Sequence, residues 1–367
     1  MLNFTYTAID DQVVTDDSPL LGHPHLAAID LKSGHRRPIT AGAAHEVFPA
    51  VTPDGRNLAF SSGAIHYDVV EYALDGSAQR DVIATALSEL APAWAPDGVR
   101  FAYSTSRSGA PEVWLRNRTD SSEKLIAGVE QFSGADALID LVISPDGSRI
   151  AYRLHRGGKV EIWISPLTGE APVRMWNDPA QTPQRGPSWS PDGNWMAYYT
   201  IQDGKAAVMK LAVGVNAAPQ TLAYATALQP VRWSPRGDWI AYRDGETMRV
   251  VSPDGKQNRV VSQFFYETYG WSKDGARILG IARGENRRVL LQQVDVDSGR
   301  ETRLADLGPV PVEMDLAEPF NEFPFRGFSL HPDGKSFLTS VLRVKTQIYL
   351  MKDFDRPTRL IDRLLAR

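Results

Sequence analysis

A three-residue turn, Pro-Asp-Gly, recurs along this chain at intervals that leave few folds open. Seven copies fall at these intervals, one with Lys in place of Pro and one with Arg in place of Asp, and a further Pro-Asp-Gly at 253–255 belongs to a second hairpin. The glycines of the seven copies are Gly55, Gly98, Gly147, Gly193, Gly237, Gly275 and Gly334. Neighbouring glycines are 38 to 59 residues apart, with a mean of 46.5 (279 residues over six intervals). A period of this length indicates an architecture in which each repeat is one supersecondary unit.

Apolar residues flank every copy at fixed distances, as Trp189 and Met196 do around Pro191 and Gly193. Proline presets φ for the first turn position, Asp tolerates the next, and Gly accepts the positive φ that closes the turn. Aromatic and β-branched flanks favour strands. Each copy therefore predicts two antiparallel strands, A and B, joined by a tight turn.

A second predicted hairpin follows each first one, so that each repeat is a four-stranded antiparallel meander, A-B-C-D. Such a meander cannot bury both faces alone, but repeats arranged around an axis bury them against one another. The sequence predicts an all-β fold, a single β-propeller over residues 1–367. Eight blades are favoured, with a degenerate first repeat in 1–40, and seven follow if 1–40 only decorates the ring. A last D strand is predicted at 358–361, which gives no sign of strand exchange between the two ends.

The string Trp-Ser-Pro-Asp-Gly-x-x-Met-Ala-Tyr at 189–198 and its copy at 143–152 resemble the PD40, or WD40-like, repeat of TolB-type propellers. The resemblance covers about residues 47–362 and implies the propeller fold. It leaves several functions open, since the repeat occurs in periplasmic TolB proteins and in propellers fused to kinases or transcription regulators. It also occurs in propeller domains of prolyl-oligopeptidase-like peptidases and in oligogalacturonate-lyase-like enzymes.

Composition narrows the function classes. The net charge is −4 and the sequence pI is about 6.0, which argues against non-specific nucleic-acid binding because that needs a basic face. No cysteine is present, so disulfides, thiolate catalysis and Cys-ligated metals are excluded. No uncharged apolar run is long enough to predict a transmembrane helix, and the first residues do not resemble a signal peptide. No Gly-x-Ser-x-Gly elbow or phosphate-binding loop occurs.

The D–A and B–C loops share the propeller face on which we expect binding residues, because they are longer and more varied than the turns. The longest, 305–327, contains Phe320, Phe323 and Phe325 together with acidic residues such as Glu313 and Glu322. With Trp176, Phe265 and Tyr266, these could form an exposed aromatic patch, or they could pack between blades. The B–C side contributes cations suited to a carboxylate-bearing or peptidic ligand, unless they are ordinary surface residues: Arg107, Arg153, His155, Arg156, Arg243 and Arg283.

Three readings of the function remain. The first is a non-catalytic propeller that binds a protein or peptide partner through its loop face, as a sensor or scaffold module of a bacterial system. The second is a polysaccharide-lyase-like propeller that acts on an acidic oligosaccharide. The third is a substrate-gating or ligand-sensing domain excised from a larger protein. We expect a monomer without cofactor, metal, catalytic residue, nucleic-acid partner or membrane insertion. A periplasmic or extracytoplasmic location is favoured if the chain is a mature or excised domain.

Overall fold

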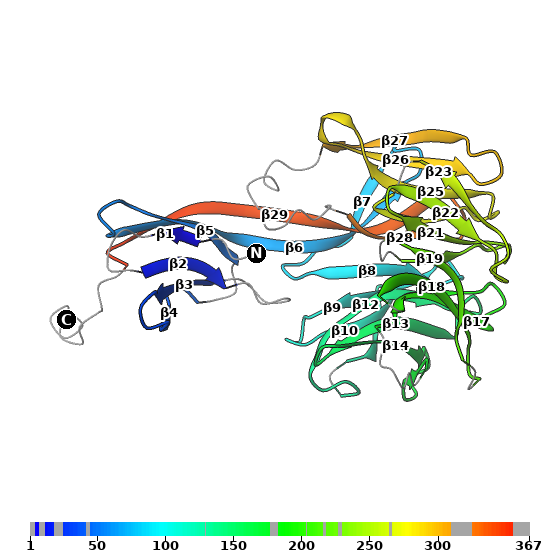
Figure 1. Ribbon diagram of the computed structural model, residues 1–367, viewed down its shortest axis with the longest axis horizontal. Helices are drawn as coiled ribbons and strands as arrows, with labels where there is room; N and C mark the ends of the chain where they lie inside the picture. The colour runs from blue at the N-terminus through cyan, green and yellow to red at the C-terminus, as the bar shows by residue number, and fades with distance from the viewer. Residues whose placement is uncertain are drawn as a thin grey trace. The chain divides into compact units, whose positions relative to one another are not determined.

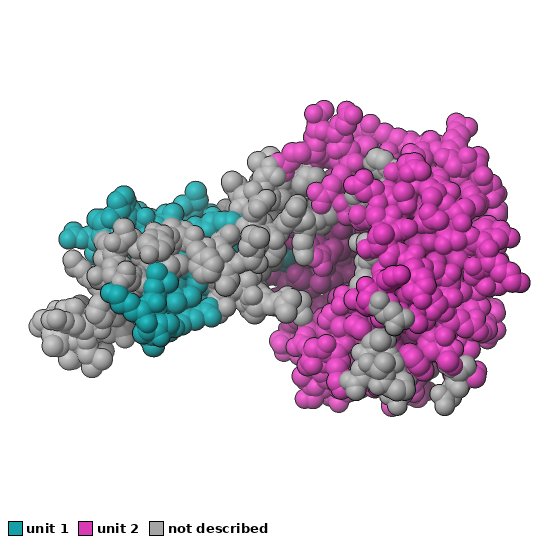
Figure 2. Space-filling view, in the orientation of Figure 1, with its two compact units in different colours: residues 1–66, 312–321, 343–367 teal, residues 67–311, 322–342 magenta. Residues whose placement is uncertain are grey.

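The computed structural model describes residues 4–6, 12–17, 25–41, 45–128, 130–176, 183–202, 204–215, 218–226, 230–263, 266–309 and 325–354. Apart from a 3-10 turn at Glu285–Arg287, every described element is a β-strand (Figure 1). The chain divides into two compact units, coloured separately in Figure 2. The smaller comprises residues 1–66, 312–321 and 343–367, and the larger comprises 67–311 and 322–342. The division differs from the predicted single ring over 1–367.

The smaller unit contains a four-stranded antiparallel sheet and the outer parts of two long strands. The sheet has the order β1 (Phe4–Tyr6), β2 (Gln12–Asp17), β3 (His25–Asp30), β4 (Arg36–Pro38). β5 (His45–Val51) pairs with the first part of β6 (Asn57–Ala73), and β6 neighbours β29 (Ser336–Lys352). The core of this unit includes Val14, Leu26, Leu58 and Phe60.

The larger unit contains five blades formed by consecutive strands, which we number 1 to 5. Blade 1 is β8 (Glu89–Trp94), β9 (Arg100–Thr105), β10 (Glu112–Asn117) and β11 (Glu123–Ala127). Blade 2 is β12 (Ala135–Ile143), β13 (Arg149–Arg156), β14 (Lys159–Pro166) and β15 (Val173–Arg174). Blade 3 is β16 (Arg185–Trp189), β17 (Trp195–Gln202), β18 (Lys205–Ala212) and β19 (Gln220–Ala225). Blade 4 is β20 (Arg232–Trp233), β21 (Ile240–Asp244), β22 (Thr247–Val251) and β23 (Asn258–Ser262). Blade 5 is β24 (Thr268–Trp271), β25 (Arg277–Arg283), β26 (Arg288–Asp295) and β27 (Glu301–Pro309).

A sixth blade combines strands from distant parts of the chain, and we call it the closing blade. Its order is β28 (Phe325–Leu330), β29, β6, β7 (Gln79–Ile83). The rings of Tyr72 on β6 and Phe337 on β29 stack with centroids 5.6 Å apart. The Ser336 hydroxyl donates to Glu71 Oε1 at 2.8 Å, across 265 residues of sequence. The chain therefore does exchange strands between its two ends, contrary to the sequence prediction.

Separate apolar clusters fill the six seams between these blades. Five lie in turn between blades 1 and 2, 2 and 3, 3 and 4, 4 and 5, and blade 5 and the closing blade. The sixth joins the closing blade to blade 1 through Val69, Leu338, Trp94 and Phe101. Because every blade packs on two neighbours, the larger unit is a closed six-bladed ring.

The Pro-Asp-Gly turns have the predicted chemistry with one addition. In the turn at Pro145, the Asp146 carboxylate accepts the Ser148 backbone N–H at 3.0 Å, and Gly147 has φ +70°. The Ser144 hydroxyl also donates to Asp146 at 2.5 Å and accepts the Arg149 N–H at 2.9 Å. The hydrogen bonds that Asp146 accepts, the one from Ser144 first and then those from Ser148, lower its pKa to about 2. The residue before the proline is thus part of the turn.

The prediction of an all-β propeller made of four-stranded antiparallel meanders is confirmed. The eight predicted repeats are all represented by strands, but those strands form seven sheets, six of four strands and one of five. In the second and eighth repeats, strands B and C run on as the single strands β6 and β29, which share one sheet. The D strand expected at 358–361 lies outside the described residues.

Candidate functional site

A bulge in the first strand of most blades determines which side chains line the centre of the ring. Blades 1, 2 and 3 and the closing blade each interrupt the A–B register, and one residue there has positive φ. These residues are Ala91 (+53°), Asp140 (+57°), Gly186 (+58°) and Gly327 (+77°). Each stands seven positions before its turn glycine. A bulge bends the strand and redirects its side chains, so this offset marks the central lining.

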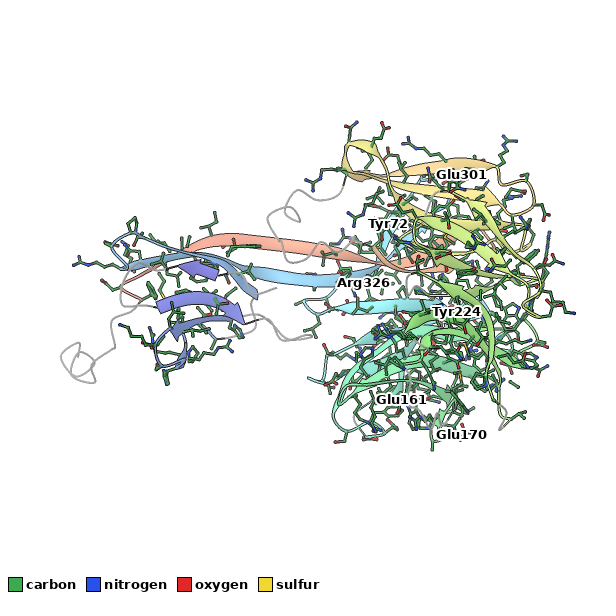
Figure 3. The ribbon with its side chains drawn as sticks, viewed as in Figure 1. Tyr72, Glu161, Glu170, Tyr224, Glu301 and Arg326 are labelled. Atoms are coloured by element: carbon green, nitrogen blue, oxygen red, sulfur yellow. The ribbon has the colours of Figure 1, made fainter. Side chains whose placement is uncertain are left out.

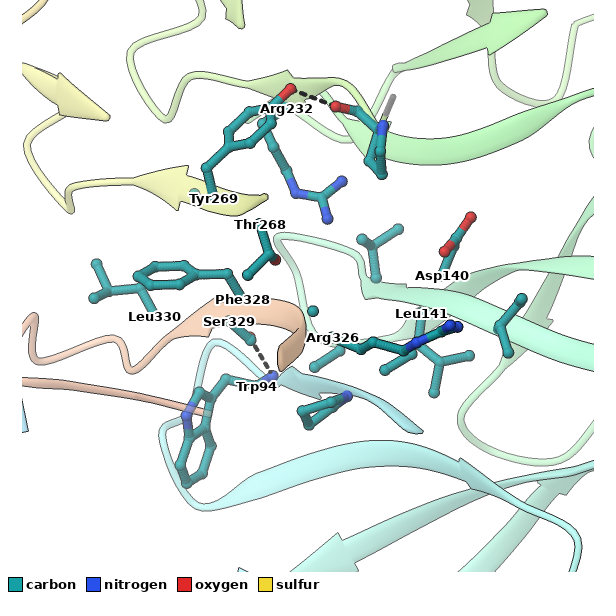
Figure 4. A pocket seen from close by; sticks show the side chains of 18 of the residues that line it. Trp94, Asp140, Leu141, Arg232, Thr268, Tyr269, Arg326, Phe328, Ser329 and Leu330 are labelled. Carbon is teal, nitrogen blue, oxygen red and sulfur yellow. Dashed lines mark hydrogen bonds between the residues drawn. The ribbon is translucent and has the colours of Figure 1, made fainter. Parts of the chain in front are cut away.

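All six blades contribute residues to one cavity of about 500 Å³, which therefore lies at the centre of the ring. Its wall is partly apolar, with Leu141 and Phe328 among the residues in Figure 4. Backbone and side chain tie neighbouring blades together around it. The backbone N–H of Trp94 donates to Ser329 Oγ at 2.8 Å, and the Tyr269 hydroxyl donates to the Pro230 carbonyl oxygen.

Three arginines and two carboxylates give the cavity its charge: Arg153, Arg232, Arg326, Asp140 and Glu267. Arg153 Nε lies 2.9 Å from Asp140 Oδ2. Glu267 accepts Arg283 Nε at 2.8 Å and lies 4.0 Å from Arg243. The two acids are thus already paired within the protein.

Arg232 and Arg326 contact neutral groups. Arg326 Nε donates to the Tyr67 hydroxyl at 3.0 Å, and its guanidinium lies 5.2 Å from the centre of that ring. Figure 3 labels Arg326, on β28, beside β8, whereas Glu170 lies at the lower edge of the larger unit. Arg232 donates to the Val231 carbonyl oxygen at 2.9 Å, and no described carboxylate lies within ion-pair distance of it. An anionic group in the cavity would find Arg232 available.

Burial alters the pKa of several groups near the cavity. It is the main cause of the raised pKa of the Tyr199 and Tyr269 hydroxyls, which therefore remain protonated donors. It is also the main cause of the lowered pKa of His155, to which Arg153 and Arg185 add. Burial likewise lowers the pKa of Arg243, although the nearby charge of Glu267 acts in the opposite direction.

The structure brings five of the predicted binding residues toward the cavity. Arg153 and Phe325 line it. Arg243 and Arg283 meet at Glu267, which also lines it. His155 follows Arg153 on the same strand and lies close enough to interact with it electrostatically.

Other predicted residues have different surroundings. Arg107 pairs with Glu123 at 2.7 Å and lies over the Trp114 ring. Arg156 is exposed at the end of β13, and Trp176 packs against the core between blades 2 and 3.

Of the two alternatives for Tyr266, the structure shows the packing between blades. Only 1% of Tyr266 is accessible, because its ring packs over Gly280 in the core between blades 4 and 5. Phe325, expected in the long loop, is buried at the start of β28. Phe265, Phe320 and Phe323 lie outside the described residues.

Sequence reasoning missed Asp140, Arg185, Arg232, Glu267 and Arg326 because it singled out aromatic residues and the cations of the B–C side, and not the charged residues in or directly before the A strands. A signal was present: Arg185, Glu267 and Arg326 each stand eight residues before a turn glycine. Among the residues that the structure describes, no group of three or more His, Asp or Glu side chains could hold a metal ion. No helix in the described ranges is long and apolar enough to cross a membrane.

The fold is similar to that of known β-propellers. The family model of the TolB beta propeller domain, PD40, matches residues 62–310. TolB from Agrobacterium tumefaciens is 21% identical, with a TM-score of 0.58, over 77% of this chain and 100% of that chain. TolB from Acinetobacter baumannii is 15% identical, with a TM-score of 0.51, over 95% of this chain and 80% of that chain. These identities show the fold alone. A search of curated protein sequences gives no match.

Proposed function

The chain belongs to the TolB β-propeller domain family, and on that basis we propose that its larger unit is a binding module for a protein or peptide partner. The central cavity holds a carboxylate-bearing segment of that partner. The observation that carries the proposal is Arg232, a cavity-lining guanidinium with no described carboxylate at ion-pair distance.

The surroundings of Arg232 support this ligand class. Guanidinium groups bind carboxylates through paired, charge-assisted hydrogen bonds. Arg326 supplies a second cation to the same cavity, and Phe328 and Leu141 supply apolar wall for the neighbouring side chains of the partner. A few polar anchors in a partly apolar concavity are the usual composition of a binding pocket.

The test is the affinity of a fluorescein-labelled peptide in which Glu and Ser alternate, measured by fluorescence polarisation. The Gln-Ser counterpart is the neutral control. We expect the acidic peptide to bind more tightly, and Arg232→Gln to weaken it about ten- to a hundred-fold, as for loss of a charged hydrogen bond. Arg326→Gln should weaken it as well, and added salt should weaken it further.

Arg80→Gln is the matched control, because Arg80 is an exposed arginine on the outer strand β7. Equal binding of both peptides, or equal losses in Arg80→Gln and Arg232→Gln, would overturn the proposal. Uronate oligomers form a second arm of the experiment. Appearance of an unsaturated product, seen by its absorbance, would replace a binding module with a lyase.

A further inference from the structure

A compact cluster of polar groups adjoins the cavity at the seam between blades 2 and 3. Arg153 and His155 stand two positions apart on β13, so their side chains share one face of the sheet. Arg185 on β16 is the cross-strand partner of Tyr199 on β17. Arg153 and Arg185 both act on His155 and on Tyr199 electrostatically. Four groups from two blades therefore surround one spot.

Three nitrogens in this cluster are buried without a hydrogen-bond partner among the described residues: Arg153 Nε, Arg185 Nε and His155 Nε2. No described carboxylate lies within ion-pair distance of Arg185, whereas Arg153 has Asp140 at 2.9 Å. An unsatisfied buried donor costs roughly 1–3 kcal/mol, so the arrangement favours an acceptor from outside the described residues.

We propose that Arg153, His155 and Arg185 form an oxyanion subsite that holds a carboxylate of the partner. The subsite deepens the proposed function and rests on it, because Arg153 and Tyr199 line both the subsite and the cavity. A carboxylate fits because its two oxygens accept from Arg185 Nε and from a protonated His155 Nε2. The partner thus needs two acidic groups, one at Arg232 and one at this seam.

Proton uptake is the signature of such a subsite. The charged groups that act on His155 are Asp136 and Asp140 on β12, Arg153 on its own strand and Arg185 on β16. Without ligand, burial and the two arginines keep the His155 pKa below its usual value. An anion beside them offsets the arginines and raises that pKa. Binding therefore takes up a proton and tightens as the pH falls, by at most about ten-fold per pH unit.

The direct test uses small anions, so that it does not depend on any peptide. The His155 imidazole is followed by NMR of protein labelled with ¹⁵N-histidine, over a pH series with and without acetate. We expect acetate to raise the His155 pKa by about half a unit or more and to leave His35, exposed in the smaller unit, unchanged. Arg185→Gln should abolish the response, and Arg185→Lys should retain part of it.

An unchanged His155 pKa in acetate would overturn the subsite. A response to inorganic phosphate but not to acetate would overturn the carboxylate assignment. The acidic peptide gives an independent readout, since its affinity should rise from pH 8 to pH 6 in wild type and stay flat in His155→Gln. A peptide that binds with no pH dependence in wild type rejects the subsite alone, whereas a peptide that never binds rejects the proposed function.

Discussion

At the scale of single residues, one buried carboxylate links the ring to pH. Only 2% of Glu89 is accessible, at the start of blade 1, where Thr85 Oγ1 donates to Glu89 Oε1 at 2.6 Å. Burial, with a further contribution from Asp68, raises the pKa of Glu89 from 4.5 to about 7. The folded protein therefore keeps a proton that the unfolded chain releases above about pH 4.5.

The consequence is a stability that falls as the pH rises. The contribution of Glu89 is fully present below pH 4.5 and is lost through pH 7, a change of about 3 kcal/mol at 1.36 kcal/mol per unit. Glu89→Gln should remove this pH dependence. The free energy of unfolding of the variant should therefore rise relative to that of wild type as the pH rises. Urea unfolding from pH 4.5 to 8 measures the difference. The exposed Glu285→Gln is the control, and parallel pH profiles for Glu89→Gln and wild type would contradict the assignment.

Gly186 is a position where no other residue fits. Its φ is +58°, and a Cβ there would lie 2.8 Å from the Tyr199 ring and 2.9 Å from Pro230 Cα. Gly186→Ala should lower the free energy of unfolding by about 2 kcal/mol or more, because strain and a backbone clash add. Ala91 occupies the same position in blade 1 at φ +53°. Ala91→Gly only relieves the backbone strain, so it should leave the free energy of unfolding nearly unchanged or raise it. A decrease as large as that of Gly186→Ala would contradict this account.

The predictable part of the site was its chemistry and not its place. Arg153, Arg243 and His155 could be foreseen because they stand toward the end of strand B, a few residues after its turn. Arg232 could not be foreseen from spacing, since it is an interior strand residue whose exposure to the cavity depends on how the blades converge. The choice between the two alternatives for Tyr266 could not be made for a related reason: its burial depends on Gly280, which comes from the neighbouring strand.

At the scale of elements, the turns depend on a hydroxyl that the sequence motif leaves outside its core. Ser144 is fully buried and bonds both Asp146 and the Arg149 N–H. Ser144→Ala should lower the free energy of unfolding by about 1–2 kcal/mol and should raise the low pKa of Asp146. Urea unfolding and carboxylate NMR measure the two effects. Ser108→Ala, at an exposed loop serine, should change neither, and an equal loss there would refute a specific role for Ser144.

The long strands β6 and β29 show what a search for repeats overlooks. The segment 336–352 contains no Gly, Pro, Asn or Asp, so nothing in it stops the strand between the expected B and C positions. In the second repeat Gly63 stands at that point without a positive φ. The turn signals predicted the strands well. The absence of a turn signal between the expected strands B and C would have predicted that they run on as one long strand.

At the scale of the whole molecule, ring closure predicts how damage at one seam spreads. Leu338 is fully buried in the cluster that joins the closing blade to blade 1, and Ile240 is as buried between blades 3 and 4. Leu338→Ala and Ile240→Ala should each cost about 2–5 kcal/mol and lower protection from hydrogen exchange throughout the larger unit. An effect of Leu338→Ala that stays within the closing blade would show that this seam does not hold the ring.

The closing blade also sets an order of events in time. Blades 1 to 5 are each made of neighbouring strands, so they can form as soon as they are synthesised. The sixth cannot, because Glu71 meets Ser336 only after 265 further residues have been made. Until then one apolar face of blade 1 and one of blade 5 stay uncovered, because the closing blade packs against both, and exposed apolar surface promotes aggregation. The slowest step of folding, and the period of greatest risk of aggregation, therefore belong to the arrival of β28 and β29.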